Sequence, residues 1–316
     1  MALTTKQIRI RLILLTVLVL LIGIGFPGMV KLGLYSGGTI VSLPLCTGMA
    51  LALLLSTKAP SRSFGKLAEA GLIFAVFLLI GAALLFSGEG FICLFIFGLV
   101  LFIPYLIGIA IGYSIQKYLW NLRVLLIGLG VVLLSATTGK PDYFPIHRTE
   151  DRIAIAAPAQ QVWAALNQPV TFGASSNFWF RNGVSYPIAM ELRTLADSTR
   201  VLYCRYNNGT ATGPVFDYAP PSHFRFHFAD SMKMMEEQNF LGQTQTMHLT
   251  HHLELIEGYF EVVPTGTASC ELRAGSVYRH KFWPVGYYNF WFDQVFHRLH
   301  HHVLDRVRQQ LVVNFH

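Results

Sequence analysis

The sequence predicts a protein of two parts: an α-helical transmembrane bundle, and an α+β domain whose antiparallel sheet curls around a long C-terminal helix. Three observations predict this fold. Residues 1–138 are almost wholly apolar, residues 139–316 have the composition of a soluble domain, and the chain ends in an amphipathic helical pattern. We therefore expect a membrane domain at 1–138, a linker at 139–149 and a second domain at 150–316.

Five stretches of residues 1–138 have about the 20 apolar residues that a membrane-spanning helix needs. Short loops separate them, and almost no ionisable residue lies deep within one, which favours a compact anchor over a transport pathway. Small residues such as Gly108 and Gly112 suit close helix packing. The five expected spans are Leu12–Val30, Gly37–Leu55, Leu67–Phe86, Phe91–Ile115 and Leu119–Thr138.

Positive charges predict the orientation of these spans, because cytoplasmic loops are enriched in Lys and Arg. With a cytoplasmic N-terminus, the outside segments near the membrane hold only Lys31 and Lys140. Residues 139–316 would then lie outside the cytoplasm, as in a bacterial inner-membrane protein with a periplasmic domain. If the short fifth stretch only lies on the membrane, that domain is cytoplasmic instead. The inside segments hold Lys6, Arg9, Arg11, Lys58, Arg62, Lys66, Lys117 and Arg123.

Several function classes lack their sequence signals. The net charge is +7, but no basic run with interleaved aromatics predicts nucleic-acid binding. Four scattered cysteines give neither a disulfide framework nor zinc-type spacing. There is also no nucleophile elbow, phosphate loop or dinucleotide-binding pattern.

The C-terminal part reads as a strand, a short helix, several antiparallel strands and one long helix. Asp151–Ala157 alternates in polarity as a half-buried strand does, and Pro158 opens a helix to Leu166. We expect a loop at Gln168–Tyr186 and another, with some helix, at Asp230–Gln245. The further strands are expected at Ile188–Thr194, Arg200–Tyr206, Thr212–Tyr218, His223–Phe228, His251–Val263 and Thr267–Arg279, before the helix Asn289–Leu311.

This order predicts a single sheet curled around one helix, with a cavity between the concave face and the helix. Apolar residues at helical spacing should pack the last helix against the sheet. They are Phe292, Phe296, Leu299, Val303 and Val307.

Three segments resemble the SRPBCC superfamily, which comprises START-like, Bet v 1-like and polyketide cyclase/dehydrase domains. They are IAIAAPAQQVWAAL, RVLYCRYNNG…VFDYAPPSHFRFHF and EGYFEVVPTGTASCELRAGSVYRHKFWPVGYYNFWFDQVFHRLHHHVL. The resemblance covers about residues 150–311 and none of the membrane part. Where the family pattern often has a threonine–glycine pair, this chain has Cys270–Gly275. The resemblance implies a helix-grip fold with a hydrophobic cavity, and no particular reaction.

All twelve histidines follow residue 140, and several lie on the last helix. Asp293, His297, His301 and Asp305 are spaced by four and share one stripe, which lies away from the apolar face. A metal site needs three or four converging ligands, so we expect no metal and no cofactor. His300 lies nearer the buried side, and His297 flanks it. The other histidines should be solvated or flanking groups.

The expected ligand-binding residues combine the helix entry with the cavity face. They are Trp179, Tyr278, Trp283, Tyr288, Trp291, Phe292, Phe296, His297 and His300. Arg193, Arg205, Arg273 and Arg279 are expected mainly on the outer sheet face.

Three functional hypotheses follow. The first is a membrane-anchored START-like module that binds an apolar or amphipathic small molecule, such as a lipid, under the C-terminal helix. The second is a cyclase/dehydrase-type enzyme in which His300 or His297 moves a proton. The third is a structural or assembly protein without a ligand. We expect a lipid or other apolar molecule and the membrane as partners, and no nucleic acid.

Overall fold

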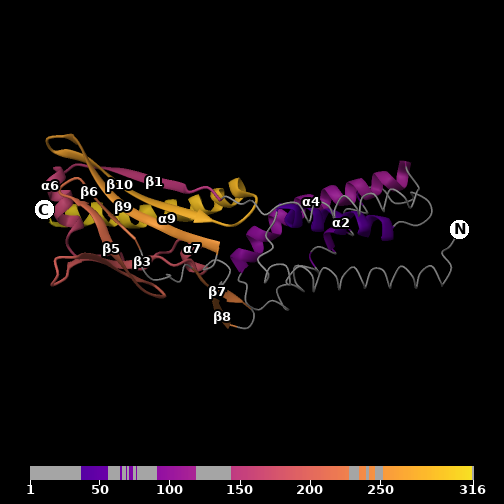
Figure 1. Ribbon diagram of the computed structural model, residues 1–316, viewed down its shortest axis with the longest axis horizontal. Helices are drawn as coiled ribbons and strands as arrows, with labels where there is room; N and C mark the ends of the chain where they lie inside the picture. Colours follow the sequence, from indigo (N-terminus) through magenta and orange to yellow (C-terminus); the bar gives the residue numbers. More distant parts are fainter. Residues whose placement is uncertain are drawn as a thin grey trace. The chain divides into compact units, whose positions relative to one another are not determined.

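The chain divides into two compact units, Met1–Tyr143 and Phe144–His316. The computed structural model describes residues 37–55, 65, 69, 71–73, 76, 91–118, 144–227, 235–239, 242–245 and 252–314. Figure 1 shows the described helices and strands in both units.

In the first unit, the second and fourth expected spans are helices. They are α2 (Gly37–Leu55) and α4 (Phe91–Tyr118). The first and fifth expected spans lie outside the described residues, as does most of the third. Within the described residues, no helix reaches both the length and the hydropathy needed to cross a membrane. The five spans stay a prediction.

Helices α2 and α4 approach closely through glycines. A Cβ on Gly108 would lie 1.9 Å from the Leu45 carbonyl oxygen, and one on Gly48 would lie 2.1 Å from that of Tyr105. Gly112 faces Ala52 and Met49 in the same way. The close packing expected from the small residues Gly108 and Gly112 is therefore confirmed for this pair of helices.

In the second unit, the described residues form an eight-stranded antiparallel sheet and three helices. The strand order is β1-β10-β9-β6-β5-β4-β3-β2, and β7 pairs with β8 separately. The elements are β1 (His147–Ile155), α6 (Ala159–Leu166), β2 (Val170–Thr171), α7 (Phe178–Arg181), β3 (Pro187–Thr194), β4 (Arg200–Tyr206), β5 (Gly209–Ala219), β6 (His223–Phe226), β7 (Glu236–Asn239), β8 (Gly242–Gln245), β9 (Leu253–Gly266), β10 (Ser269–His280) and α9 (Val285–Asn314).

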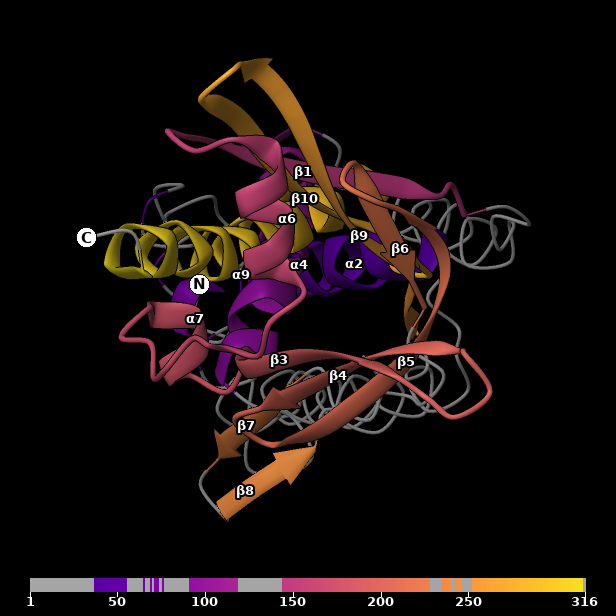
Figure 2. The same cartoon turned by 90° about the vertical axis from the view of Figure 1, so that its left-hand side faces the viewer.

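Helix α9 runs between the two arms of the curled sheet. Figure 2, together with Figure 1, shows β1, β10 and β9 on one side of α9 and β3, β4 and β5 on the other. Its most extensive strand contacts are with β1 and β10. This arrangement is a helix-grip fold, and it confirms the fold predicted for the C-terminal part.

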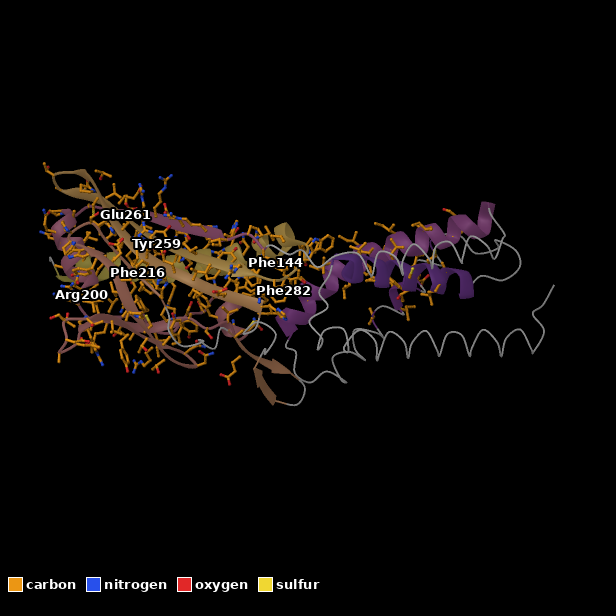
Figure 3. All side chains as sticks on the ribbon, viewed as in Figure 1. Phe144, Arg200, Phe216, Tyr259, Glu261 and Phe282 are labelled. Atoms are coloured by element: carbon orange, nitrogen blue, oxygen red, sulfur yellow. The ribbon has the colours of Figure 1, made fainter. Side chains whose placement is uncertain are left out.

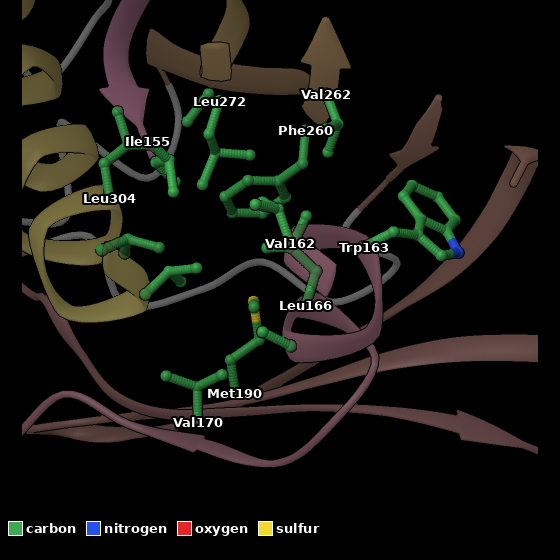
Figure 4. Packing of buried hydrophobic residues seen from close by; sticks show 14 of the residues in the cluster. Ile155, Val162, Trp163, Leu166, Val170, Met190, Phe260, Val262, Leu272 and Leu304 are labelled. Atoms are coloured by element: carbon green, nitrogen blue, oxygen red, sulfur yellow. The ribbon is translucent and has the colours of Figure 1, made fainter. Parts of the chain in front are cut away.

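The main apolar core gathers around α6 and the C-terminal half of α9. Val162 and Leu166 of α6 pack with Leu272 of β10 and Leu304 of α9, as Figure 4 shows. Fully burying each such side chain stabilises the fold by roughly 1.5–3 kcal/mol. A separate cluster lies along the N-terminal half of α9 and contains Leu253, Tyr278 and Phe296, with Leu255, Phe292 and Leu299 packed against it.

Several elements differ from the expected ones. Strand β1 begins at His147, inside the predicted linker, because its pairing with the long β10 continues to Tyr278. Helix α7 lies in an expected loop, where the Asn177 side chain accepts a hydrogen bond from the Trp179 backbone N–H at 3.0 Å.

Strands β2, β7 and β8 and the start of α9 also differ, and β2 lies in the loop expected at Gln168–Tyr186. The segment expected to be a loop with some helix holds strands β7 and β8, which pair antiparallel from Glu236↔Gln245 to Asn239↔Gly242. Helix α9 begins four residues earlier than expected, after Pro284, whose carbonyl accepts from the Tyr287 and Tyr288 N–H groups.

Candidate functional site

A polar seam joins α9 to β1 and β10, and one nearly buried carboxylate is at its centre. Asp151 lies on β1, and its side chain is 10% exposed. The Nδ1 atom of His297 lies 2.8 Å from both Asp151 oxygens, and that of His300 lies 2.8 Å from Oδ2. His301 Nε2 is 3.4 Å from Oδ1. Three histidines of one helix segment therefore share one carboxylate.

The hydrogen bonds assign a tautomer to His300. A carboxylate only accepts hydrogen bonds, so His300 donates through Nδ1–H. In the neutral ring, Nε2 then accepts from the Ser276 hydroxyl on β10, 2.9 Å away. Ser276, His300 and Asp151 thus form a continuous hydrogen-bonded chain from β10 through α9 to β1.

The electrostatics of Asp151 follow from these partners. Burial alone would raise the pKa of Asp151, but the hydrogen bonds from His300 and His297 outweigh it and hold that pKa below its usual value. Over the described part of the chain, no group of three or more His, Cys, Asp or Glu side chains has a geometry that could hold a metal ion.

A second carboxylate extends the seam by about two turns of α9. Asp293 Oδ2 accepts from His147 Nε2 at 3.2 Å, and Oδ1 accepts from the Tyr278 hydroxyl at 3.1 Å and from the Thr149 hydroxyl. His147, Thr149 and Asp151 alternate along β1, so all three side chains face α9. The seam therefore follows one face of a single strand.

An aromatic cluster encloses the N-terminal half of α9. Its centre is His280 of β10, which is nearly buried and bonds the Asn289 side chain at 2.8 Å. Burial lowers the pKa of His280, so the ring is neutral near pH 7. Phe282, labelled in Figure 3, stacks on Tyr288 at 5.0 Å. The rings within about 6 Å of His280 are those of Tyr278, Phe282, Tyr288 and Phe292.

Helix α7 brings a further group of aromatic side chains to α9. The Trp179 and Trp291 rings are 5.9 Å apart. Phe180 and Tyr186 stack against each other and surround His302, which bonds the Pro187 carbonyl at 3.1 Å. Burial lowers the pKa of His302 as well.

The predicted site residues therefore fall into three places. His297 and His300 lie in the polar seam. Tyr278, Tyr288, Phe292 and Phe296 lie in or beside the aromatic cluster, and Trp179 and Trp291 meet at α7. Trp283, partly buried, lies in the connection between β10 and α9. Whether any of them binds a ligand stays a prediction.

Two expectations about charged residues have clear outcomes. The stripe was expected to lie away from the buried face: His301 is exposed, as expected, whereas Asp293 is partly buried because β1 and β10 supply its hydrogen-bond partners. The arginines lie on the outer sheet face, as expected: Arg193 pairs with Glu191, Arg273 with Glu271 and Arg279 with Glu254, and Arg205 is exposed.

Sequence reasoning missed Asp151 and its neighbours His147 and Thr149. A signal for Asp151 was present. It shares the strand parity of Ile153 and Ile155, both buried, so the alternation places a carboxylate on the apolar face. A charge in that position requires polar partners on the element that covers it.

The far side of α9 faces β3–β5, where Tyr206 is the notable residue. Tyr206 lies at the end of β4 and packs against the main core. Burial, followed by the nearby Cys204 thiol, raises its pKa well above the usual value for tyrosine. As a whole residue, Tyr206 is partly buried.

Comparisons with known proteins give likenesses of fold. No family model and no curated protein matches the sequence. Among solved structures, a norcoclaurine synthase point mutant from Thalictrum flavum, in complex with a transition-state analogue, is 11% identical with a TM-score of 0.36, and covers 56% of this chain and 100% of its own. The Zhui aromatase/cyclase from Streptomyces sp. R1128 is 12% identical with a TM-score of 0.33, covering 54% and 97%. An uncharacterised Bacillus thuringiensis protein is 9% identical with a TM-score of 0.34, covering 52% and 99%. At these values the likenesses carry no argument about function.

Proposed function

We propose that the C-terminal unit binds an apolar or amphipathic small molecule, such as a lipid, between α9 and the sheet that curls around it. The observation that carries this proposal is the incomplete burial of apolar side chains on the face of α9 that packs against the sheet. Phe292 and Leu299 belong to this face, yet each is only partly buried. An apolar ligand between the helix and the sheet would cover the part that stays accessible.

The residues around this space suit an apolar ligand. Met190 of β3 and Leu202 of β4 are buried and apolar. On α9, Phe292 and Leu299 pack against the cluster of Leu253, Tyr278 and Phe296 and are only partly buried. A ligand that covered them would complete their burial, at about 25 cal/mol for each Å² of apolar surface.

Native mass spectrometry of the purified full-length protein tests ligand binding. We expect a co-purified small molecule, and we expect Leu299→Trp to reduce its occupancy about tenfold, because the indole fills the space. Arg298→Trp is the matched control, since Arg298 is exposed on the same helix turn. A protein that stays empty when fatty alcohols or fatty acids are added contradicts the proposal.

We further propose that residues 1–138 anchor this unit to a membrane, with residues 139–316 on the outer side. The amino-acid sequence supports both points. Helix α4 has one charged residue, Lys117, among its 28 residues, and the distribution of positive charges favours a cytoplasmic N-terminus. Carbonate extraction and a reporter fused to the C-terminus test both points. Release of the full chain by carbonate contradicts the anchor, and a reporter active in the cytoplasm contradicts the orientation.

The second candidate is a cyclase/dehydrase-type enzyme. The Asp151–His300 hydrogen bond favours it, because this bond fixes the tautomer of the imidazole that would transfer the proton. The mass of the co-purified ligand separates the two candidates. If the protein is a carrier, the same compound should co-purify with the native protein and with the His300→Gln variant. If it is an enzyme that needs His300, the compound that co-purifies with the variant should differ from the one in the native protein.

A further inference from the structure

An exposed group of aromatic side chains lies where α7 meets the first turns of α9. The rings of Trp179 and Trp291, which are 5.9 Å apart, join the two helices. Phe178 contacts Trp179 with ring centroids 5.7 Å apart. Phe290 and Tyr287 contact Trp291 at 5.2 and 6.2 Å. These five rings form one connected group, which we call the aromatic patch.

The two outermost rings of the patch face solvent. Phe178 is 65% exposed and Phe290 is 55% exposed. A single exposed ring is ordinary on a soluble domain, but a contiguous group of exposed apolar side chains marks a contact surface. Trp and Tyr rings are enriched at the level of lipid headgroups, because they combine an apolar body with a polar N–H or O–H group. The patch therefore has the composition of a surface that meets a bilayer.

The charges of the two segments that carry the patch suit an anionic surface. Residues 172–190 hold one charged residue, Arg181, and residues 280–292 hold one, Lys281. Neither segment contains Asp or Glu. Arg181 and Lys281 are both exposed. Basic side chains close to a bilayer are attracted to anionic lipid headgroups.

The acidic side chains near these segments are mostly engaged within the domain. Asp293 accepts hydrogen bonds in the polar seam. Glu254 pairs with Arg279 at 2.8 Å. Glu236 of β7 also comes close to α7, because its backbone N–H bonds the Gly183 carbonyl at 2.9 Å, and it is partly buried. The exposed charges beside the patch are therefore mainly basic.

The chain enters the second unit at the end that carries the patch. His147, the first residue of β1, pairs with Tyr278, two residues before β10 ends, and α9 begins at Val285. Eight residues, 139–146, separate β1 from the predicted membrane domain, and fully extended they span at most about 28 Å. A domain tethered to a membrane at this end keeps the patch close to the bilayer.

We propose that the aromatic patch docks the C-terminal unit on the bilayer surface, with Phe178 and Phe290 in the interfacial layer of the lipid. Arg181 and Lys281 then meet anionic headgroups. This proposal rests on the membrane anchor proposed above. A second copy of the chain fits the patch less well, because a two-fold contact would bring the basic side chains of both copies together.

Photo-crosslinking to lipid tests the docking surface. The full-length protein is reconstituted in vesicles of phosphatidylcholine and phosphatidylglycerol that contain a phospholipid with a diazirine on its headgroup, and crosslinked residues are located by mass spectrometry. We expect residues 178–181 and 287–291 to be crosslinked at least about tenfold more than the β3–β4 turn, 195–199. The double variant Phe178→Ser/Phe290→Ser should lose at least about four fifths of the crosslinks at the patch.

The matched control is Leu195→Ser, because Leu195 is 49% exposed in the β3–β4 turn, away from the patch. It should keep the crosslinks at the patch within about twofold of the native level. A patch that a second copy or another protein covers would not be crosslinked to lipid, and this result overturns the proposal, as does a crosslinked patch that the double variant leaves unchanged.

The same experiment separates this proposal from the proposed function. Crosslinks confined to residues 1–138 overturn the docking surface and leave the anchor intact. Crosslinks at the patch without any in residues 1–138 support the docking surface and count against the anchor. Ligand binding is measured separately by native mass spectrometry, so an empty protein leaves the crosslinking result intact.

Discussion

The two halves of α9 differ in what holds them to the sheet. The C-terminal half is fixed by apolar side chains in the main core, with Leu304 and Val307 completely buried. The N-terminal half is held by Asp151, Asp293 and an aromatic cluster, and several of its apolar residues are only partly buried. Apolar packing is insensitive to pH, whereas the contacts of the polar half depend on the charge of Asp151, whose pKa is held below its usual value. The two halves should therefore differ in how much they stabilise the fold and in how that stabilisation depends on pH.

The largest expected loss of stability comes from a substitution in the apolar half of α9. Leu304→Ala should lower the free energy of unfolding of the C-terminal unit by about 2–5 kcal/mol, because a fully buried leucine leaves a cavity in the core. Urea denaturation followed by tryptophan fluorescence measures the change. Gln309→Ala, exposed on the same helix, should stay within about 0.5 kcal/mol. Equal effects of the two substitutions would show that this half is not the anchor.

The next effect comes from the polar half. Asp151→Asn removes a carboxylate that accepts hydrogen bonds from two histidines, and at pH 7 should cost about 1.5–3 kcal/mol of unfolding free energy. Because the folded pKa of Asp151 lies below its unfolded value of about 4, this stabilisation is present above pH 4 and is lost as the pH falls through the folded pKa.

Urea titrations of both proteins between pH 7 and pH 3 measure the difference. The native protein should lose its advantage over Asp151→Asn below about pH 4. A difference that persists unchanged at pH 3 would mean that the carboxylate charge is not what stabilises the seam.

Much of the helix-grip unit could be predicted from periodicity, and the reason is local. Strand β4 was predicted with its observed bounds, because its alternation between inward residues such as Leu202 and outward ones such as Tyr203 is complete within the strand. The gripping face of α9 was predicted for the same reason: Phe296, Val303 and Val307 are buried as their spacing indicates.

The candidate site was harder to predict, because it depends on which elements meet. The helical stripe of Asp293, His297 and His301 was visible in the sequence, but a helix pattern does not show what covers each face. Strand β1 covers that stripe, and its first residues were assigned to a linker. The pairing of His147 with Tyr278 is a contact over more than a hundred residues, and no local pattern encodes it.

The smallest expected loss of stability comes from removing one hydroxyl group within the polar half. Tyr278→Phe keeps the buried ring between Phe292 and Phe296 and removes only the hydroxyl that donates to Asp293. We expect a loss of about 1 kcal/mol, because the Thr149 hydroxyl and His147 still satisfy that carboxylate. Tyr203→Phe, on the outer face of β4, is the control and should be near neutral. A loss as large as that for Asp151→Asn would show that Asp293 depends on this one donor, and that the aromatic cluster and the seam act as a single unit.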